Sequence, residues 1–156
     1  MKIYKRLQSE HIFLDAVLKD KDEVFRFVAD TFARDGVVTH ARLFYERMIE
    51  REETMSTGIG SGIAIPHAAS PEANNPAVLL IRPMHLIDFE ALDGLPVDII
   101  LALVVPENQT ALHLQILAGI SRLCKKTEFL GIVRNASNSK ELLEGVRHIE
   151  ERIAFH

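Results

Sequence analysis

The sequence has one cysteine, no tryptophan and no long apolar run. A single cysteine, Cys124, cannot form a disulfide within the chain, and this favours the reducing cytoplasm as its setting. The longest uninterrupted apolar run, 99–105, falls far short of the ~20 residues that a membrane-spanning helix needs. Residues 1–11 have a basic start with no apolar segment after it. We therefore expect no signal peptide and no insertion into a membrane.

The sequence also lacks a basic stripe, and its net charge of −4 makes nucleic acid an unexpected partner. Its composition, 47% hydrophobic and 26% charged, is typical of a globular protein. A length of 156 residues is sufficient for one domain with a full core. We therefore expect residues 1–156 to form a single domain.

Apolar periodicity predicts helices and strands that are interspersed along the chain. We expect helices over 20–34, after a capping Thr39, over 109–125 and 129–134, and after Ser139. We expect strands over 63–65, 77–81, 87–89 and 97–105, and a turn at Asp93-Gly94. Strands among helices predict an α/β sandwich with a mixed sheet.

The segment 56–68 holds the sequence's main candidate site. Gly58, Gly60 and Gly62 let the backbone approach a ligand, and N–H groups in such a loop can hold an anion. The apolar run 63–65 predicts a short buried strand that Pro66 would end, directing the side chain of His67. An imidazole there is suited to carry a proton or a phosphoryl group. A strand-end histidine that only caps a loop is an equally good interpretation of these residues alone.

The same loop does not match the nucleotide-binding motifs. The third glycine of a dinucleotide fingerprint would fall at position 63, which is Ile63, and no Gly-Lys-Ser/Thr occurs. No histidine pair has the spacing of a common zinc motif, so we expect no metal and no cofactor. The histidines expected at the surface are His11, His40, His85, His148 and His156.

Two further residues are candidates for the site of His67. His113 lies near the start of a predicted helix and at the edge of its apolar face. It is either a partly buried structural histidine or a ring that converges with His67. Arg51 precedes the glycine loop and either binds phosphate through its guanidinium or pairs with Glu50 or Glu53. Cys124 lies in a helical apolar pattern and is expected to pack as a small hydrophobic residue.

At this point the sequence resembles the type-2 IIA domains of the bacterial phosphoenolpyruvate-dependent sugar phosphotransferase system. That family includes fructose- and mannitol-type IIA domains and the nitrogen-related regulatory IIA protein. The resemblance extends over about residues 5–150 in collinear order. Its matching stretches are 14–24, 51–52, 56–60, 62–67, 89–94, 96–98, 105–106 and 113–114.

The resemblance implies an α/β sandwich with about five strands and assigns roles to individual residues. The histidine of the Ile-Pro-His motif, His67, would be phosphorylated, with His113 in support and Arg51 beside the phosphoryl group. Phosphoryl transfer needs donors for the equatorial oxygens, and Thr57 and the N–H of Gly58 are candidates. The chain departs from the family at 68–70, Ala-Ala-Ser, where a glycine and a basic residue usually follow the histidine.

The resemblance implies a histidine phosphotransferase that carries phosphate from the histidine phosphocarrier protein to a IIB domain for fructose- or mannitol-type uptake. Such a carrier needs neither ATP nor a metal, because its donor is another phosphohistidine. The alternative is a regulatory protein whose binding to targets depends on its phosphorylation. A structural domain that has lost the chemistry is disfavoured by the presence of His67, His113 and Arg51.

Overall fold

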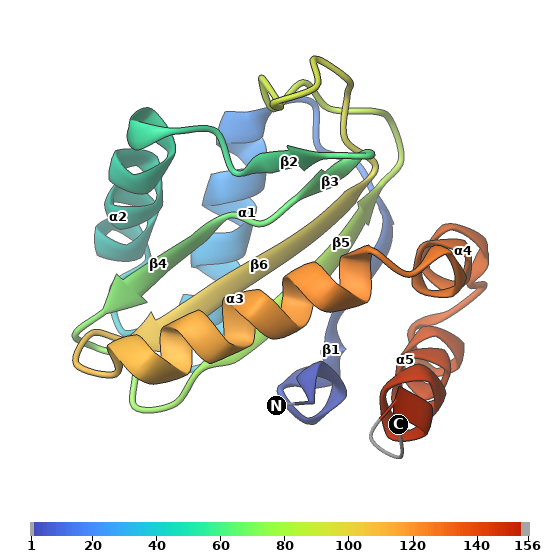
Figure 1. The fold of residues 1–156 in the computed structure, drawn as a ribbon. Helices are drawn as coiled ribbons and strands as arrows, with labels where there is room; N and C mark the ends of the chain where they lie inside the picture. The colour runs from blue at the N-terminus through green and yellow to red at the C-terminus, as the bar shows by residue number, and fades with distance from the viewer. Residues whose placement is uncertain (1, 154–156) are drawn as a thin grey trace.

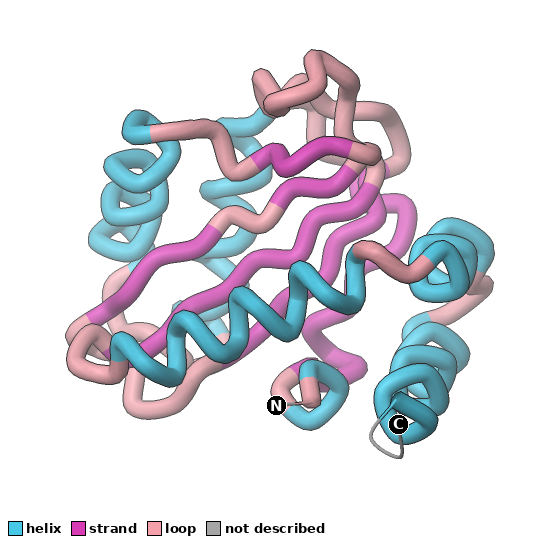
Figure 2. Tube along the Cα trace, viewed as in Figure 1, coloured by secondary structure: helices cyan, strands magenta, loops and turns pink. Residues whose placement is uncertain are grey.

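The computed structural model describes residues 2–153, which form one mixed sheet with helices on both faces (Figures 1 and 2). The strand order is β1-β5-β6-β3-β2, and β4 also pairs with β6. The predicted α/β sandwich with a mixed sheet is confirmed, with six strands rather than about five. The strands are β1 (Leu7–Ala16), β2 (Gly58–Gly60), β3 (Ile63–Ala64), β4 (His67–Ser70), β5 (Ala77–Pro83) and β6 (Ile99–Pro106).

Helices α1 and α2 pack against one face of the sheet, and α3, α4, α5 and the short 3-10 helix η1 cover the other (Figure 1). The helices are η1 (Ile3–Lys5), α1 (Lys21–Arg34), α2 (Ala41–Thr54), α3 (Thr110–Cys124), α4 (Thr127–Asn135) and α5 (Ser139–Ile153). The bounds of α1–α5 agree with the predicted helices within a few residues, whereas η1 was not predicted. None of the described helices is both long and apolar enough to cross a membrane.

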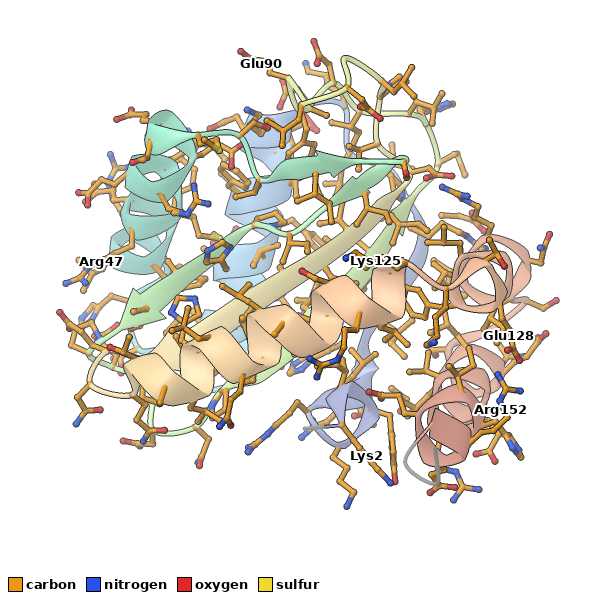
Figure 3. All side chains as sticks on the ribbon, in the orientation of Figure 1. Lys2, Arg47, Glu90, Lys125, Glu128 and Arg152 are labelled. Atoms are coloured by element: carbon orange, nitrogen blue, oxygen red, sulfur yellow. The ribbon has the colours of Figure 1, made fainter. Side chains whose placement is uncertain are left out.

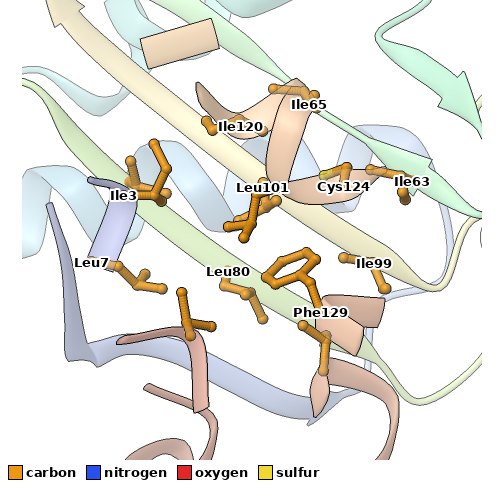
Figure 4. Close-up of a cluster of buried hydrophobic side chains, with 14 of the residues drawn as sticks. Ile3, Leu7, Ile63, Ile65, Leu80, Ile99, Leu101, Ile120, Cys124 and Phe129 are labelled. Atoms are coloured by element: carbon orange, nitrogen blue, oxygen red, sulfur yellow. The ribbon is translucent and has the colours of Figure 1, made fainter. Parts of the chain in front are cut away.

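Strand β6 is the centre of the core. All eight of its residues are buried, and successive side chains of a strand point to opposite faces. Leu101 and Leu103 therefore join the cluster under α3–α5, together with Ile63 and Ile65, as Figure 4 shows in part. Ala102 joins the cluster under α1 and α2. The uninterrupted apolar pattern of β6 follows from burial on both faces.

Two short strands, β3 and β4, pair with β6 one after the other, with Pro66 in the break between them. Ile63 lies opposite Ile99, and His67 lies opposite Leu103, both in parallel. The strand before Pro66 does end, as expected, but a new strand begins directly after Pro66. Strand pairing resumes at His67, and the carbonyl of Pro66 accepts from Leu103 N at 3.0 Å. His67 is therefore the first residue of β4, and its position is fixed by the pairing of β4 with β6.

The N-terminal strand β1 was not expected from the sequence, and the prediction that His11 lies at the surface is wrong. His11 is only 4% exposed. Its Nε2 lies 2.8 Å from a carboxylate oxygen of Asp35, and its ring packs edge-on against Phe32. The three histidines His40, His85 and His148 are exposed as predicted, and His156 lies outside the described residues.

Two local expectations differ from the structure. Thr39 is not the N-cap residue of α2. That residue is His40, and the His40 side chain makes no capping hydrogen bond. Instead the carboxylate of Glu72 accepts from the N–H groups of Thr39 and His40, at 3.2 and 2.9 Å. The expected strand 87–89 is reduced to one bridge, between Ile87 and Val97.

Candidate functional site

His67 is buried at the start of β4 and has a defined ring orientation. Its Nδ1 lies 2.7 Å from the carbonyl oxygen of Ile65. A carbonyl oxygen can only accept, so Nδ1 carries the hydrogen in this contact. A neutral ring then has its lone pair on Nε2. The structure therefore leaves Nε2 as the ring nitrogen of His67 with a free lone pair.

His113 is the fourth residue of α3, and its ring lies against that of His67. The ring centroids are 5.3 Å apart and the ring planes are 77° apart. Ala69, two residues after His67, packs under α3–α5, whereas Ala68 packs under α1 and α2. Alternation along β4 thus places His67 on the side of the sheet that α3 covers. The prediction that the rings of His67 and His113 converge is confirmed.

The second ring retains an unused polar atom. Within residues 2–153, Nε2 of His113 is buried and has no hydrogen-bond partner. Buried polar atoms without partners are uncommon in native proteins and call for an explanation.

Both imidazoles are held in the neutral form. Burial is the largest cause that lowers the pKa of His67. The charge of Arg51 lowers it further, as does that of His113 when the His113 ring is protonated. The hydrogen bond to Ile65 and the charge of Glu52 oppose this shift. Burial and then the charge of Arg51 also lower the pKa of His113. A neutral ring is the state in which a histidine nitrogen can act as a nucleophile.

Arg51 lies in the last turn of α2, close enough to both rings for its charge to lower their pKa values. Its Nη1 donates to the carbonyl of Met55 at 2.9 Å. The alternative pairing with Glu50 or Glu53 is not found: no carboxylate of the described residues lies within 4.0 Å of the guanidinium. The remaining N–H groups of Arg51 stay available for an anion.

An ion pair joins the two elements that border the site. Arg47 of α2, labelled in Figure 3, has its Nη1 3.5 Å from a carboxylate oxygen of Glu107. Glu107 lies in the turn between β6 and α3. The pair therefore links the helix that carries Arg51 to the turn before the helix that carries His113.

Thr57 and Gly58 have partners within the protein. The hydroxyl of Thr57 donates to Glu52 at 2.6 Å, and its N–H also points at this carboxylate. The N–H of Gly58 donates to the hydroxyl of Ser56 at 3.0 Å. A Cβ on Gly58 would lie 2.8 Å from that of Ala91, so close packing accounts for the glycine. Both expected phosphoryl donors are thus engaged elsewhere in this structure.

The segment 68–70, where the chain departs from the family pattern, is structural here. Ala68 and Ala69 pack on opposite faces of the sheet. Ser70 is buried, and its hydroxyl accepts from the N–H of Glu72 at 3.1 Å. Without a basic residue here, Arg51 is the cation whose charge acts on both imidazoles.

Sequence reasoning did not include Glu52 among the site residues. Its side chain is only 7% exposed, and it contacts both Thr57 and Lys21. The one signal was the Arg51-Glu52 pair within the stretches that resemble the family. Cys124, by contrast, packs as expected: it is buried, and burial raises the pKa of its thiol to about 12.

Comparison with known proteins agrees with this arrangement. Residues 5–149 match the family described as "Phosphoenolpyruvate-dependent sugar phosphotransferase system, EIIA 2". The chain belongs to this family. IIA domains of this system are phosphocarriers in phosphoryl transfer, and one with the same fold, the mannitol IIA of Escherichia coli, has been solved in complex with phosphorylated IIB.

Relatives within the family have two kinds of name. The chain is 32% identical over 130 residues to a nitrogen regulatory protein of Pseudomonas aeruginosa, covering 83% of this chain and 84% of that one. It is 30% identical over 144 residues to the fructose-specific EIIABC component of Bacillus subtilis, covering 92% of this chain and 23% of that protein. The crystal structure of the nitrogen regulatory protein IIA-Ntr from Neisseria meningitidis superposes with a TM-score of 0.86 at 28% identity, covering 92% and 98% of the two chains.

Proposed function

We propose that this protein is a phosphocarrier in which Nε2 of His67 accepts a phosphoryl group from a phosphohistidine and later gives it up. The observation that carries the proposal is the 2.7 Å contact between Nδ1 of His67 and Ile65 O, in a buried ring with a lowered pKa. This contact fixes which nitrogen is protonated. It leaves a lone pair on the other nitrogen at neutral pH.

The transfer forms one bond and breaks one. The lone pair of His67 Nε2 attacks phosphorus in line with the leaving nitrogen. The P–N bond of the donor breaks, and its electron pair returns to the donor's imidazole. The ring of His67 then bears a positive charge next to its own phosphoryl group. The Nδ1–H donated to Ile65 stabilises this cationic ring, because hydrogen bonds from charged donors are the stronger ones.

Two side chains are placed to bind the equatorial oxygens in this proposal. Arg51 offers guanidinium N–H groups and a positive charge, and His113 offers its buried Nε2 as a donor in the corresponding tautomer. Such donors lower the barrier when they are already placed where charge develops. His113 therefore acts as a supporting residue and His67 as the nucleophile.

We assign the histidine phosphocarrier protein as donor and a IIB domain as acceptor, in fructose- or mannitol-type uptake. The family assignment and the fructose-specific EIIABC relative support this assignment. Such transfer requires neither nucleotide nor metal, and it places the protein in the cytoplasm with its donor.

Intact-mass measurement tests the nucleophile. The protein is incubated with phosphoenolpyruvate, enzyme I and the histidine phosphocarrier protein. We expect the wild-type protein to gain one acid-labile phosphoryl group and His67→Ala to gain none. The matched variant His113→Ala should still gain the group, more slowly. An acid-labile group on His67→Ala would reassign the nucleophile.

A regulatory role is the second candidate, with the same phosphorylation of His67 but a different output. It is supported by the 32% identical nitrogen regulatory protein and by the superposition with IIA-Ntr. Adding purified IIB proteins of the fructose and mannitol types separates the two roles. Rapid loss of the phosphoryl group to one of them supports transport. A phosphoprotein stable with both, which binds target proteins differently from the unmodified form, supports regulation.

A further inference from the structure

A buried carboxylate, that of Glu52, lies directly after Arg51 at the end of α2. It accepts from Thr57 Oγ1 at 2.6 Å and from Thr57 N at 3.0 and 3.1 Å. The ammonium of Lys21, the first residue of α1, lies 3.0 Å away. A buried carboxylate is tolerated only when it is paired and hydrogen-bonded. Glu52 meets that condition through one residue of the glycine loop and one lysine.

Thr57 connects Glu52 to the residues just before His67. Its carbonyl accepts from the N–H of Ile65 at 2.9 Å. The carbonyl of Ile65 in turn accepts from Nδ1 of His67 at 2.7 Å. Both polar backbone groups of residue 65 are thus occupied, one by Thr57 and one by His67. Three successive contacts connect the carboxylate of Glu52 to the imidazole.

On the other side of Glu52, Lys21 connects the carboxylate to an exposed residue. Lys21 lies 3.6 Å from a carboxylate oxygen of Glu90, which is 80% exposed and is labelled at the rim of the molecule in Figure 3. The same ammonium lies 5.7 Å from the ring centroid of Phe89. Lys21 is therefore held in place by an aromatic ring as well as by two carboxylates.

We propose that Glu52, held by Lys21, is a positioning residue for His67 that acts through Thr57 and Ile65. Its role is to keep the Ile65 carbonyl where it selects the Nδ1–H form of the ring and leaves the lone pair on Nε2. The inference rests on the proposed role of His67 as the nucleophile. Glu52 touches no reacting atom, so its contribution is to ring orientation.

The test combines nitrogen NMR of the His67 ring with transfer kinetics. The wild-type protein should show a neutral ring protonated at Nδ1. In Glu52→Gln, which loses the charge and one acceptor, we expect a mixture of the two ring forms. The kcat of phosphoryl transfer should fall about tenfold. The KM for the histidine phosphocarrier protein should change less than about twofold, because the Glu52 side chain is only 7% exposed and offers little surface to a partner.

Glu53→Gln is the matched control, since it removes the same charge from the next residue of the same helix. Glu53 is exposed and has no ion pair among the described residues. It should match the wild-type protein in ring form, kcat and melting temperature. If Glu53→Gln mixes the ring forms as Glu52→Gln does, a general charge effect replaces the positioning role.

A second pair of variants covers the case in which Glu52→Gln does not fold. Thr57→Val removes the hydroxyl donor at nearly equal volume, and Thr57→Ser keeps it. The serine variant should keep the Nδ1–H form and the rate, whereas the valine variant should lose part of both. A folded Glu52→Gln, or else Thr57→Val, with the wild-type ring form and kcat would overturn the proposal. If the wild-type protein accepts no phosphoryl group, the proposed function fails, while the ring spectra still decide the role of Glu52.

Discussion

His67 and His113 lie edge to face, 5.3 Å between ring centroids, and a lowered pKa keeps both rings neutral. Two imidazolium rings at this distance would repel each other, so the arrangement depends on neutrality. Desolvation by the protein and the nearby charge of Arg51 provide it. The arrival of an anionic group, as proposed for His67, would change the charge around both rings.

Replacing Arg51 with alanine should slow phosphoryl transfer far more than it weakens the fold. Loss of one charged donor raises the barrier by about 2–4 kcal/mol, or roughly 30- to 1000-fold in rate. Loss of a half-buried helix-end side chain should cost under ~0.5 kcal/mol of stability. Transfer rate and melting temperature are measured on the same variant. Arg42→Ala, on the exposed side of the same helix, is the control and should leave the rate unchanged.

Arg51→Lys asks whether charge alone is sufficient. Lysine keeps the charge but not the planar pair of donors. We expect only partial recovery of the rate. A near-normal rate would show that a point charge is enough. A large drop in melting temperature for Arg51→Ala, at unchanged rate, would instead make Arg51 part of the scaffold.

His113→Ala should lower the rate of phosphoryl transfer roughly 100-fold, the typical effect of losing one placed donor. It should not abolish phosphorylation, because His67 provides the nucleophile. The melting temperature should change little, since Nε2 of His113 makes no hydrogen bond within the described residues. Single-turnover kinetics with the phosphorylated histidine phosphocarrier protein provides the measurement. An unchanged rate would make His113 a structural residue only.

Stability should fall as the pH is lowered through the ordinary histidine range. Burial lowers the pKa of His67 in the folded protein, whereas an unfolded chain protonates its histidines near pH 6.5. Below about pH 6.5 the unfolded state therefore binds more protons and is favoured. Above that value the ring of His67 is neutral in both the folded and the unfolded state. The stability then no longer depends on pH through this group.

Urea unfolding at about pH 7.5 and about pH 5.5 measures this effect, with His67→Gln as the reference. The variant should lose less stability than the wild-type protein over this interval. Glu150, a carboxyl group whose pKa burial raises, is present in both proteins and cancels in the comparison. Equal losses in the two proteins would contradict the lowered pKa of His67.

Gly62→Ala should be the most destabilising of three glycine replacements, at roughly 1–3 kcal/mol. Gly62 has φ of +81°, and a Cβ there would lie 2.6 Å from Asp98 Oδ1 and 2.9 Å from Arg134 Nη2. Gly94 has φ of +76° with nothing within 4 Å, so Gly94→Ala isolates backbone strain. Gly131→Ala, in a helix with open space, should stabilise the protein slightly. Thermal unfolding should rank the three variants in that order.

The sequence predicted the elements whose apolar pattern is dense and missed those that distant residues hold in place. The helices and β6 were predictable because burial on one or two faces leaves a regular pattern. Strand β1 was not, since it includes Ser9, Glu10 and His11, and its burial does not alternate. His11 is buried because Asp35 and Phe32, more than twenty residues away, surround it.

The candidate site shows the same division. His67, His113 and Arg51 could be named from the sequence. In the structure the two histidine rings lie together, and the charge of Arg51 lowers the pKa of both. The engagement of Thr57 by Glu52 could not be predicted, because apolar periodicity does not show that the chain after α2 turns back to the Glu52 side chain. The capping of α2 by Glu72 could not be predicted for a different reason: it joins residues more than thirty positions apart.

The burial of β6 on both faces has a consequence for amide exchange. Its amides are covered by side chains above and below and lie between β5 on one side and β3 and β4 on the other. Exchange of these hydrogens with solvent requires opening of the whole sheet, so they report the global free energy of unfolding. His67 pairs with this strand, whose amides we expect to exchange slowest, whereas His113 belongs to the first turn of a helix, where hydrogen bonds fray. We therefore expect the two halves of the site to belong to regions with different free energies of opening.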